Sequence, residues 1–166
     1  MIATLIHWLV STRLSEFVLN VAWVWPISET IHFTGLVLLA GTVGFFDLRL
    51  LGLAKGIPPA AIHRLVPIGL LGFGLSIATG TLFIFGTPDQ YFYNAAFHWK
   101  LVFLGLMGLN VVFFYSKPFA IVRRLGPHDE IPLVVRVCAA VSLISMIGVM
   151  CCGRMLTFFR PPGYFI

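Results

Sequence analysis

Four long apolar runs constrain this chain more than any other feature of its sequence. The runs lie at about 27–46, 65–85, 97–115 and 131–159. These lengths match the roughly 20 residues that an α-helix needs to cross about 30 Å of hydrocarbon. Their apolar residues are continuous rather than alternating, which favours helices over the short strands of a membrane barrel. The sequence therefore predicts an all-α integral membrane protein with a four-transmembrane-helix bundle.

Composition excludes a soluble domain. Of the 166 residues, 59% are hydrophobic and 10% are charged, whereas soluble domains have about half and a quarter. No Gly-rich phosphate loop or zinc-ligand spacing is present, so the sequence pI of about 9.5 indicates contact with anionic lipid rather than nucleic acid. No nucleophile lies beside a base at a recognisable spacing, which favours a redox or accessory subunit over a stand-alone enzyme.

Residues 1–20 have a different pattern from the four runs. Polar side chains recur there at helical spacing (Thr4, His7, Ser11 and Ser15), opposite apolar ones (Ile2, Leu5, Leu9, Leu14 and Phe17). This pattern predicts an N-terminal interfacial amphipathic helix over 1–20, followed by a transmembrane domain over 21–166. The alternative is an amphipathic extension of the first span.

The basic residues are divided unequally between the two sides of the predicted bundle. One side carries Arg49, Lys55, Arg64, Lys117, Arg123, Arg124 and Arg136, and the other carries Arg13, Lys100, Arg154 and Arg160. Cytoplasmic loops carry the excess of Lys and Arg. We therefore expect a multi-pass protein of the bacterial inner membrane with both termini on the periplasmic side.

Ionisable residues within membrane spans are costly and are therefore candidate functional residues. At the predicted outer level they are Glu29, His32, His98, Lys100 and Arg154. Glu29 and His32 share a helix face that Gly35 continues, and a small residue beside a His lets a flat macrocycle approach. His32 and His98 would then be axial ligands of a b-type haem. The alternative is an ion pair of Glu29 with Lys100 or Arg154 that His32 completes.

A second polar level is predicted at the inner end, where Asp47 is expected to pair with a nearby Arg. Its members are Asp47, Arg49, His63, Arg64 and Arg136.

Sulfur-containing residues crowd the outer half of the fourth span, chiefly Met146, Met150, Cys151 and Cys152. Such soft ligands suit Cu(I), although Met and Cys also fill gaps in apolar cores. Small residues recur in the second span (Gly72, Ser76 and Gly80) and the third (Gly105 and Gly108). These faces are expected to let helices approach closely, or to receive a lipid, a quinone or a partner helix.

Three segments carry a resemblance to a known family: WPISETIHFTGLVLLAGTVGFFDLRLLG at 25–52, AFHWKLVFLGLMGLN at 96–110 and GRMLTFF at 153–159. Together they closely resemble a bacterial family of small four-span membrane proteins with no assigned activity, over nearly the whole chain. The resemblance implies that its motif positions are Glu29, His32, Gly35, Asp47, Arg49, Leu50, Lys100, Asn110 and Arg154. More distantly, the second and third spans look like the helical domain of the copper resistance protein D family, which is similar to four-helix b-type cytochromes.

These observations support three hypotheses about function. The first is a haem-b electron-transfer subunit between quinone and a periplasmic partner, with His32 as the principal axial ligand. The second is a non-catalytic accessory subunit that docks other membrane subunits or a second copy of the chain. The third is a transporter of copper or of a small solute.

Overall fold

The computed structural model describes residues 2–159 and contains four helical stretches long and apolar enough to cross a membrane. They are Val24–Leu50, Pro59–Gly86, Ala95–Ser116 and Leu133–Met155. The protein is therefore a multi-pass membrane protein with an all-α fold, as the sequence predicts. Arg160 and the Pro161–Gly163 segment, part of the orientation argument and of the predicted end of the fourth span, lie outside the described residues.

The observed spans differ from the predicted ones mainly at their ends. The first consists of α3 (Val24–Leu39), a π-helical turn η1 (Ala40–Gly44) and α4 (Phe45–Leu50). The second consists of α5 (Pro59–His63) and α6 (Val66–Gly86). The third is α8 (Ala95–Ser116), and the fourth, α10 (Leu133–Met155), ends four residues before the predicted Phe159. Short helices α7 (Pro88–Phe92) and α9 (Pro118–Val122) lie in the connections.

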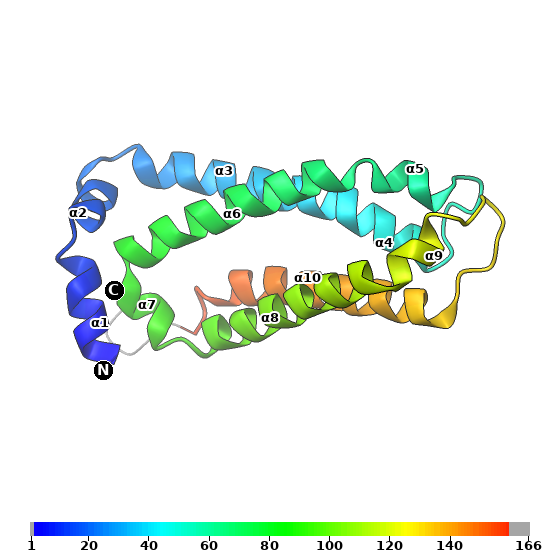
Figure 1. The fold of residues 1–166 in the computed structure, drawn as a ribbon. Coiled ribbons are helices and arrows are strands. Elements are labelled where there is room, and N and C mark those ends of the chain that lie inside the picture. The colour runs from blue at the N-terminus through cyan, green and yellow to red at the C-terminus, as the bar shows by residue number, and fades with distance from the viewer. Residues whose placement is uncertain (1, 160–166) are drawn as a thin grey trace.

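The N-terminal segment is two helices rather than the predicted single one. α1 (Ile2–Val10) and α2 (Arg13–Asn20) are bent by 63°. The chain turns at Thr12, whose hydroxyl accepts a hydrogen bond from the Ser15 N–H at 3.2 Å and so caps α2. Ser15 was predicted on the polar face but is buried, whereas Phe17 is exposed. Figure 1 shows α1 lying across the end of the bundle rather than along it.

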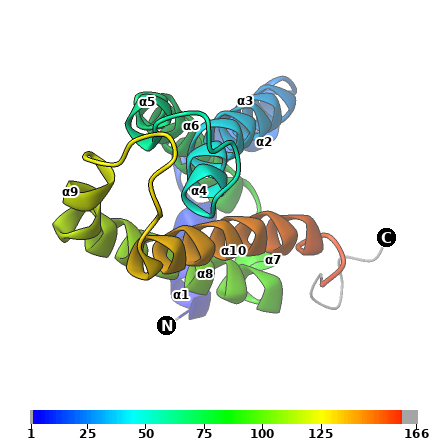
Figure 2. The same cartoon turned by 90° about the vertical axis from the view of Figure 1, so that its right-hand side faces the viewer.

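The long helices pack as two pairs, α3 with α6 and α8 with α10. Figure 2, which looks along the bundle, shows α3, α5 and α6 on one side and α8 and α10 on the other. The pairs contact each other mainly where η1 and α4 meet α10. We call this end, with α4, α5 and α9, the basic end, and the end with α1, α2 and α7 the N-terminal end (Figure 1).

Small residues bring α3 and α6 into backbone contact. A Cβ atom built on Gly35 would lie closer than 3.0 Å to the Gly72 carbonyl oxygen and the Ser76 hydroxyl, and one on Gly72 would overlap the Gly35 carbonyl oxygen. The small-residue face predicted in the second span is therefore confirmed as a helix contact. Gly105 and Gly108 of α8 have no neighbour within 4 Å of such a Cβ, so neither lies at a contact between helices of this chain.

The π-helical turn η1 changes the helix that the first span packs against. Before it, the buried residues of α3 include Gly35 and Leu39, which face α6. Within it, Gly44 lies against the Met146 side chain of α10. After it, Phe46 and Leu50 enter the main hydrophobic core, which collects residues of α4, α5, α6, α8, α9 and α10 at the basic end. A π-turn includes one extra residue and so rotates the following helix faces.

Candidate functional site

His32 on α3 faces α6, where its Nδ1 lies 2.9 Å from the Thr79 hydroxyl oxygen. The Thr79 hydroxyl donates its only proton to the Leu75 carbonyl at 2.7 Å. The Nδ1 atom of His32 must therefore be the donor in its contact with Thr79. This fixes the tautomer and leaves the lone pair on Nε2, which is the arrangement of a metal-ligating histidine.

The surroundings of the His32 ring are aromatic and small. Phe83 packs edge-on at 5.5 Å between ring centroids, and a Cβ on Gly80 would lie 3.6 Å from the imidazole Cε1. Gly35 was predicted to admit a macrocycle beside His32, but its face is filled by α6. Its observed role is helix packing, and Gly80 is the small residue that borders the imidazole.

The other polar residues predicted at this level lie on separate helices. Lys100 of α8 is half-buried and lies against α10, with its Nζ 3.9 Å from a Cβ built on Gly153. His98 is exposed on the first turn of α8, next to Phe97, and Arg154 is exposed with its guanidinium 5.8 Å from the Phe158 ring centroid.

Glu29 does not form the ion pair that the sequence suggested. It is exposed on α3, and within residues 2–159 neither Lys100 nor Arg154 lies within 4.0 Å of its carboxylate. Its charge acts instead on Tyr91 of α7. Burial raises the pKa of the Tyr91 phenol to about 12, and Glu29 adds to the effect. Tyr91 therefore stays protonated at neutral pH.

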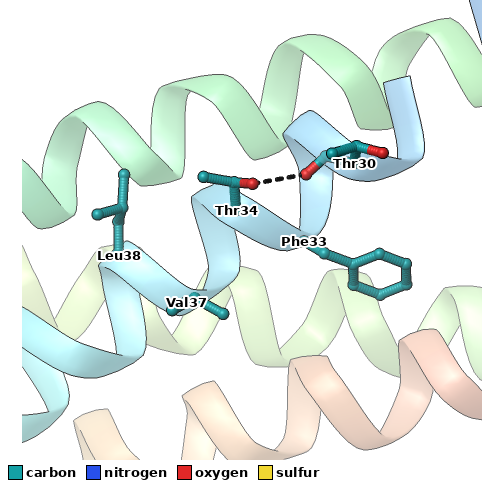
Figure 3. A pocket seen from close by; sticks show the side chains of 5 residues that line it. All are labelled: Thr30, Phe33, Thr34, Val37 and Leu38. Atoms are coloured by element: carbon teal, nitrogen blue, oxygen red, sulfur yellow. Dashed lines mark hydrogen bonds between the residues drawn. The ribbon is translucent and has the colours of Figure 1, made fainter. Parts of the chain in front are cut away.

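A hollow of about 430 Å³ runs along one face of α3, and Figure 3 draws the side chains that line it. It is lined by Thr30, Phe33, Thr34, Val37 and Leu38. The Thr34 hydroxyl donates to the Thr30 carbonyl at 2.8 Å, so it is satisfied within the helix. Phe33 and Val37 are among the exposed large hydrophobic residues. The hollow is therefore an apolar surface suited to a hydrocarbon chain.

The sulfur-containing residues of α10 differ in burial. Met146 is buried against Gly44, Met150 and Cys152 are half-buried, and Cys151 is exposed. In the part of the chain that the structure describes, no three His, Cys, Asp or Glu side chains are grouped as metal ligands.

Arg49 joins the two loops of the basic end. Its side chain is 1% exposed, and its Nε donates to the Ile57 carbonyl at 2.6 Å while Nη2 donates to the Pro127 carbonyl at 2.7 Å. It also borders a hollow of about 100 Å³ whose other lining residues include Lys55, Arg136, Asp129 and Glu130. Arg49 thus binds backbone carbonyls and does not pair with Asp47, contrary to the sequence expectation.

Asp47 of α4 is buried on the side of the helix that meets α10, with 5% of its surface exposed. Its Oδ2 atom has no hydrogen-bond partner, and the Ser142 side chain of α10 faces its carboxyl group. Asn110 of α8 donates to the Cys138 carbonyl of α10 at 3.0 Å, one helical turn before Ser142. Asn110 therefore fixes the α8–α10 pair beside Asp47.

Sequence reasoning missed Thr79, Ser142 and Asn94. Thr79 follows Ser76 on the buried stripe of α6, a signal that spacing of 3–4 residues could have given. Asn94 is fully buried, caps α8 through the Ala96 N–H and donates to the Leu156 carbonyl at 2.9 Å. Only the folded chain brings Leu156 to it.

One comparison with known proteins gives a match. The model of a family described as "Family of unknown function (DUF6644)" matches residues 22–159. No curated protein and no solved structure matches the chain.

Proposed function

The chain belongs to this family of unknown function, and we propose that it is a small electron-transfer subunit of the membrane that holds a b-type haem through His32. It would exchange electrons between quinone and a periplasmic partner. A bound haem supplies one-electron transfer, with a potential set by its ligands and surroundings. The residues of the chain supply the ligand, its orientation and an apolar environment.

The observation that supports this proposal is the hydrogen-bond chain from His32 to Thr79 and on to Leu75. It holds the imidazole in one orientation with Nε2 free to bind iron. His98 is the candidate for the second ligand, from α8 of the other helix pair. Lys100 offers a cation for a carboxylate of the group, and the hollow along α3 offers a surface for the apolar tail of a quinone.

We expect the protein, expressed with a supply of haem, to contain haem b in a pyridine haemochrome assay. His32→Ala is expected to abolish the haem signal, because it removes the Nε2 ligand. Thr79→Val keeps the shape but removes the acceptor for Nδ1, and should weaken haem affinity by about 10–100-fold. His128→Ala, in an exposed loop of the basic end, is the matched control and should bind haem as the wild type does.

Two results would contradict the haem proposal: absence of haem b in the wild-type protein, or full haem occupancy in His32→Ala. The same preparation tests a second candidate, an accessory subunit. The exposed surface around Gly105 and Gly108 favours it, because small residues without neighbours suit a partner helix. Haem-free protein that reproducibly copurifies with other membrane subunits in mild detergent would support this candidate, and a solitary species would oppose it.

We also propose that the basic end faces the cytoplasm of a bacterium and that both termini lie on the periplasmic side. Six of the seven basic residues that the sequence places on that side lie in or next to the loops of this end: Lys55, Arg64, Lys117, Arg123, Arg124 and Arg136. A reporter enzyme that is active only in the periplasm, fused to the C-terminus, should be active. The same reporter inserted after Lys55 should be inactive, and the reverse pattern would refute the orientation.

A further inference from the structure

Asp47 is a buried ionisable group that the proposed electron transfer does not use. It lies within the first span, just after η1, and its side chain is directed into the interior of the bundle. An α-helix without the π-turn would place this position differently, so the turn helps to bury Asp47. Its Oδ2 atom is an unpartnered polar atom in a structure in which buried polar groups are otherwise paired almost throughout.

Within residues 2–159, no cation that could balance a negative charge lies within 4.0 Å of the Asp47 carboxylate. From its own helix, Arg49 points away to the loop carbonyls of Ile57 and Pro127. From α10 come Ser142, which faces the carboxyl group, and Cys138. From α8 comes Tyr115, whose hydroxyl lies 2.8 Å from Nε2 of His63 on α5. Among the described residues, the ionisable groups of α8 and α10 on which the charge of Asp47 acts are thus a phenol and a thiol.

An ionised carboxylate buried without a cation is strongly unfavourable, and such groups remain neutral instead. We propose that Asp47 is a proton-binding site inside the bundle, which carries a proton at neutral pH and releases it reversibly as a carboxylate plus a free proton. The unpartnered Oδ2 is where this proton resides, and the Ser142 hydroxyl orients the carboxyl group. The proposal stands independently of haem, because it rests on the other end of the bundle.

Infrared difference spectroscopy tests the proposal on the full chain in lipid vesicles. At neutral pH, Asp47→Asn should remove the C=O stretching band of a protonated carboxyl group, and deuterium oxide should shift that band in the wild type. An ordinary carboxyl group is protonated in only about one molecule in a thousand at this pH. The matched control, Glu130→Gln at an exposed position, should leave the protonated carboxyl band of the wild type in place.

Raising the pH should convert the Asp47 band into carboxylate bands, and returning to neutral pH should restore it. Ser142→Ala gives a second measurement that keeps Asp47 in place: the band should persist but shift in frequency, since the facing hydroxyl is lost. Loss of carboxylate bands in Asp47→Asn at neutral pH would overturn the proposal. So would a carboxyl band that is unaffected by pH up to the point of unfolding.

Discussion

Replacing Arg49 with alanine is expected to lower the free energy of unfolding by about 3–6 kcal/mol, at about 1.5–3 kcal/mol for each hydrogen bond from a charged donor. The two bonds reach carbonyls of different loops, Ile57 between the first and second spans and Pro127 between the third and fourth. Their loss leaves both carbonyls without this donor and removes a fully buried side chain. The measurement is chemical or thermal unfolding of the purified protein in detergent.

Two variants separate the role of the guanidinium from that of charge. Arg49→Lys keeps the positive charge but lacks the planar fork that reaches two acceptors, so its stability should fall between those of wild type and Arg49→Ala. Arg124→Ala removes an exposed positive charge at the same end and should change stability by no more than about 0.5 kcal/mol. Equal stability of Arg49→Lys and wild type would show that charge alone suffices and that the loop contacts contribute little.

Gly35→Ala is expected to destabilise the protein by about 1–3 kcal/mol or more, the range for overpacked cores. The added methyl group would overlap the Gly72 carbonyl oxygen and the Ser76 hydroxyl. Because one of these neighbours is backbone, α6 must move as a body to relieve the overlap. That displacement would also disturb the contact between His32 and Thr79 one turn away. Unfolding in detergent again measures the effect.

Gly74→Ala provides a matched control on the partner helix. Gly74 lies on α6 with no atom within 4 Å of an added Cβ. The same substitution should be neutral there or stabilise the helix by up to about 1 kcal/mol, because alanine has the higher helix propensity. The two substitutions are thus expected to change stability in opposite directions. Similar effects at both sites would contradict the close contact between α3 and α6.

The fold was predictable from sequence where the bilayer itself imposes the pattern. Long apolar runs are required to cross a membrane, so the four spans and their helical character could be identified without knowledge of any contact. The break between α1 and α2 was not predicted, although the sequence carries a signal for it: Thr12 stands in a polar run and is a residue type that caps helices, as it does here through the Ser15 N–H. The turn η1 was also missed, since a change in backbone hydrogen bonding has no compositional signal.

The sequence identified the residues of the candidate sites but not the residues that they contact. The cost of ionisable groups in hydrocarbon identified His32, Asp47 and Arg49 from the sequence. Their partners depend on which spans pair and how the loops close, which one sequence does not give. Asp47 and Arg49, two residues apart, thus contact different parts of the protein. Haem binding, the copper site, the orientation and the likeness to the copper resistance family stay predictions.

The π-helical turn η1 also determines which changes in chain length the first span can tolerate. One residue of an α-helix corresponds to a rotation of about 100°, from 3.6 residues per turn. Restoring regular α-helical bonding through Ala40–Gly44 with the chain length unchanged would turn all of α4 by about that angle. Asp47 would leave α10, and Arg49 would leave both loops. Deleting one residue of the turn at the same time would cancel that rotation, so we expect family members that lack the π-helical turn to be one residue shorter there.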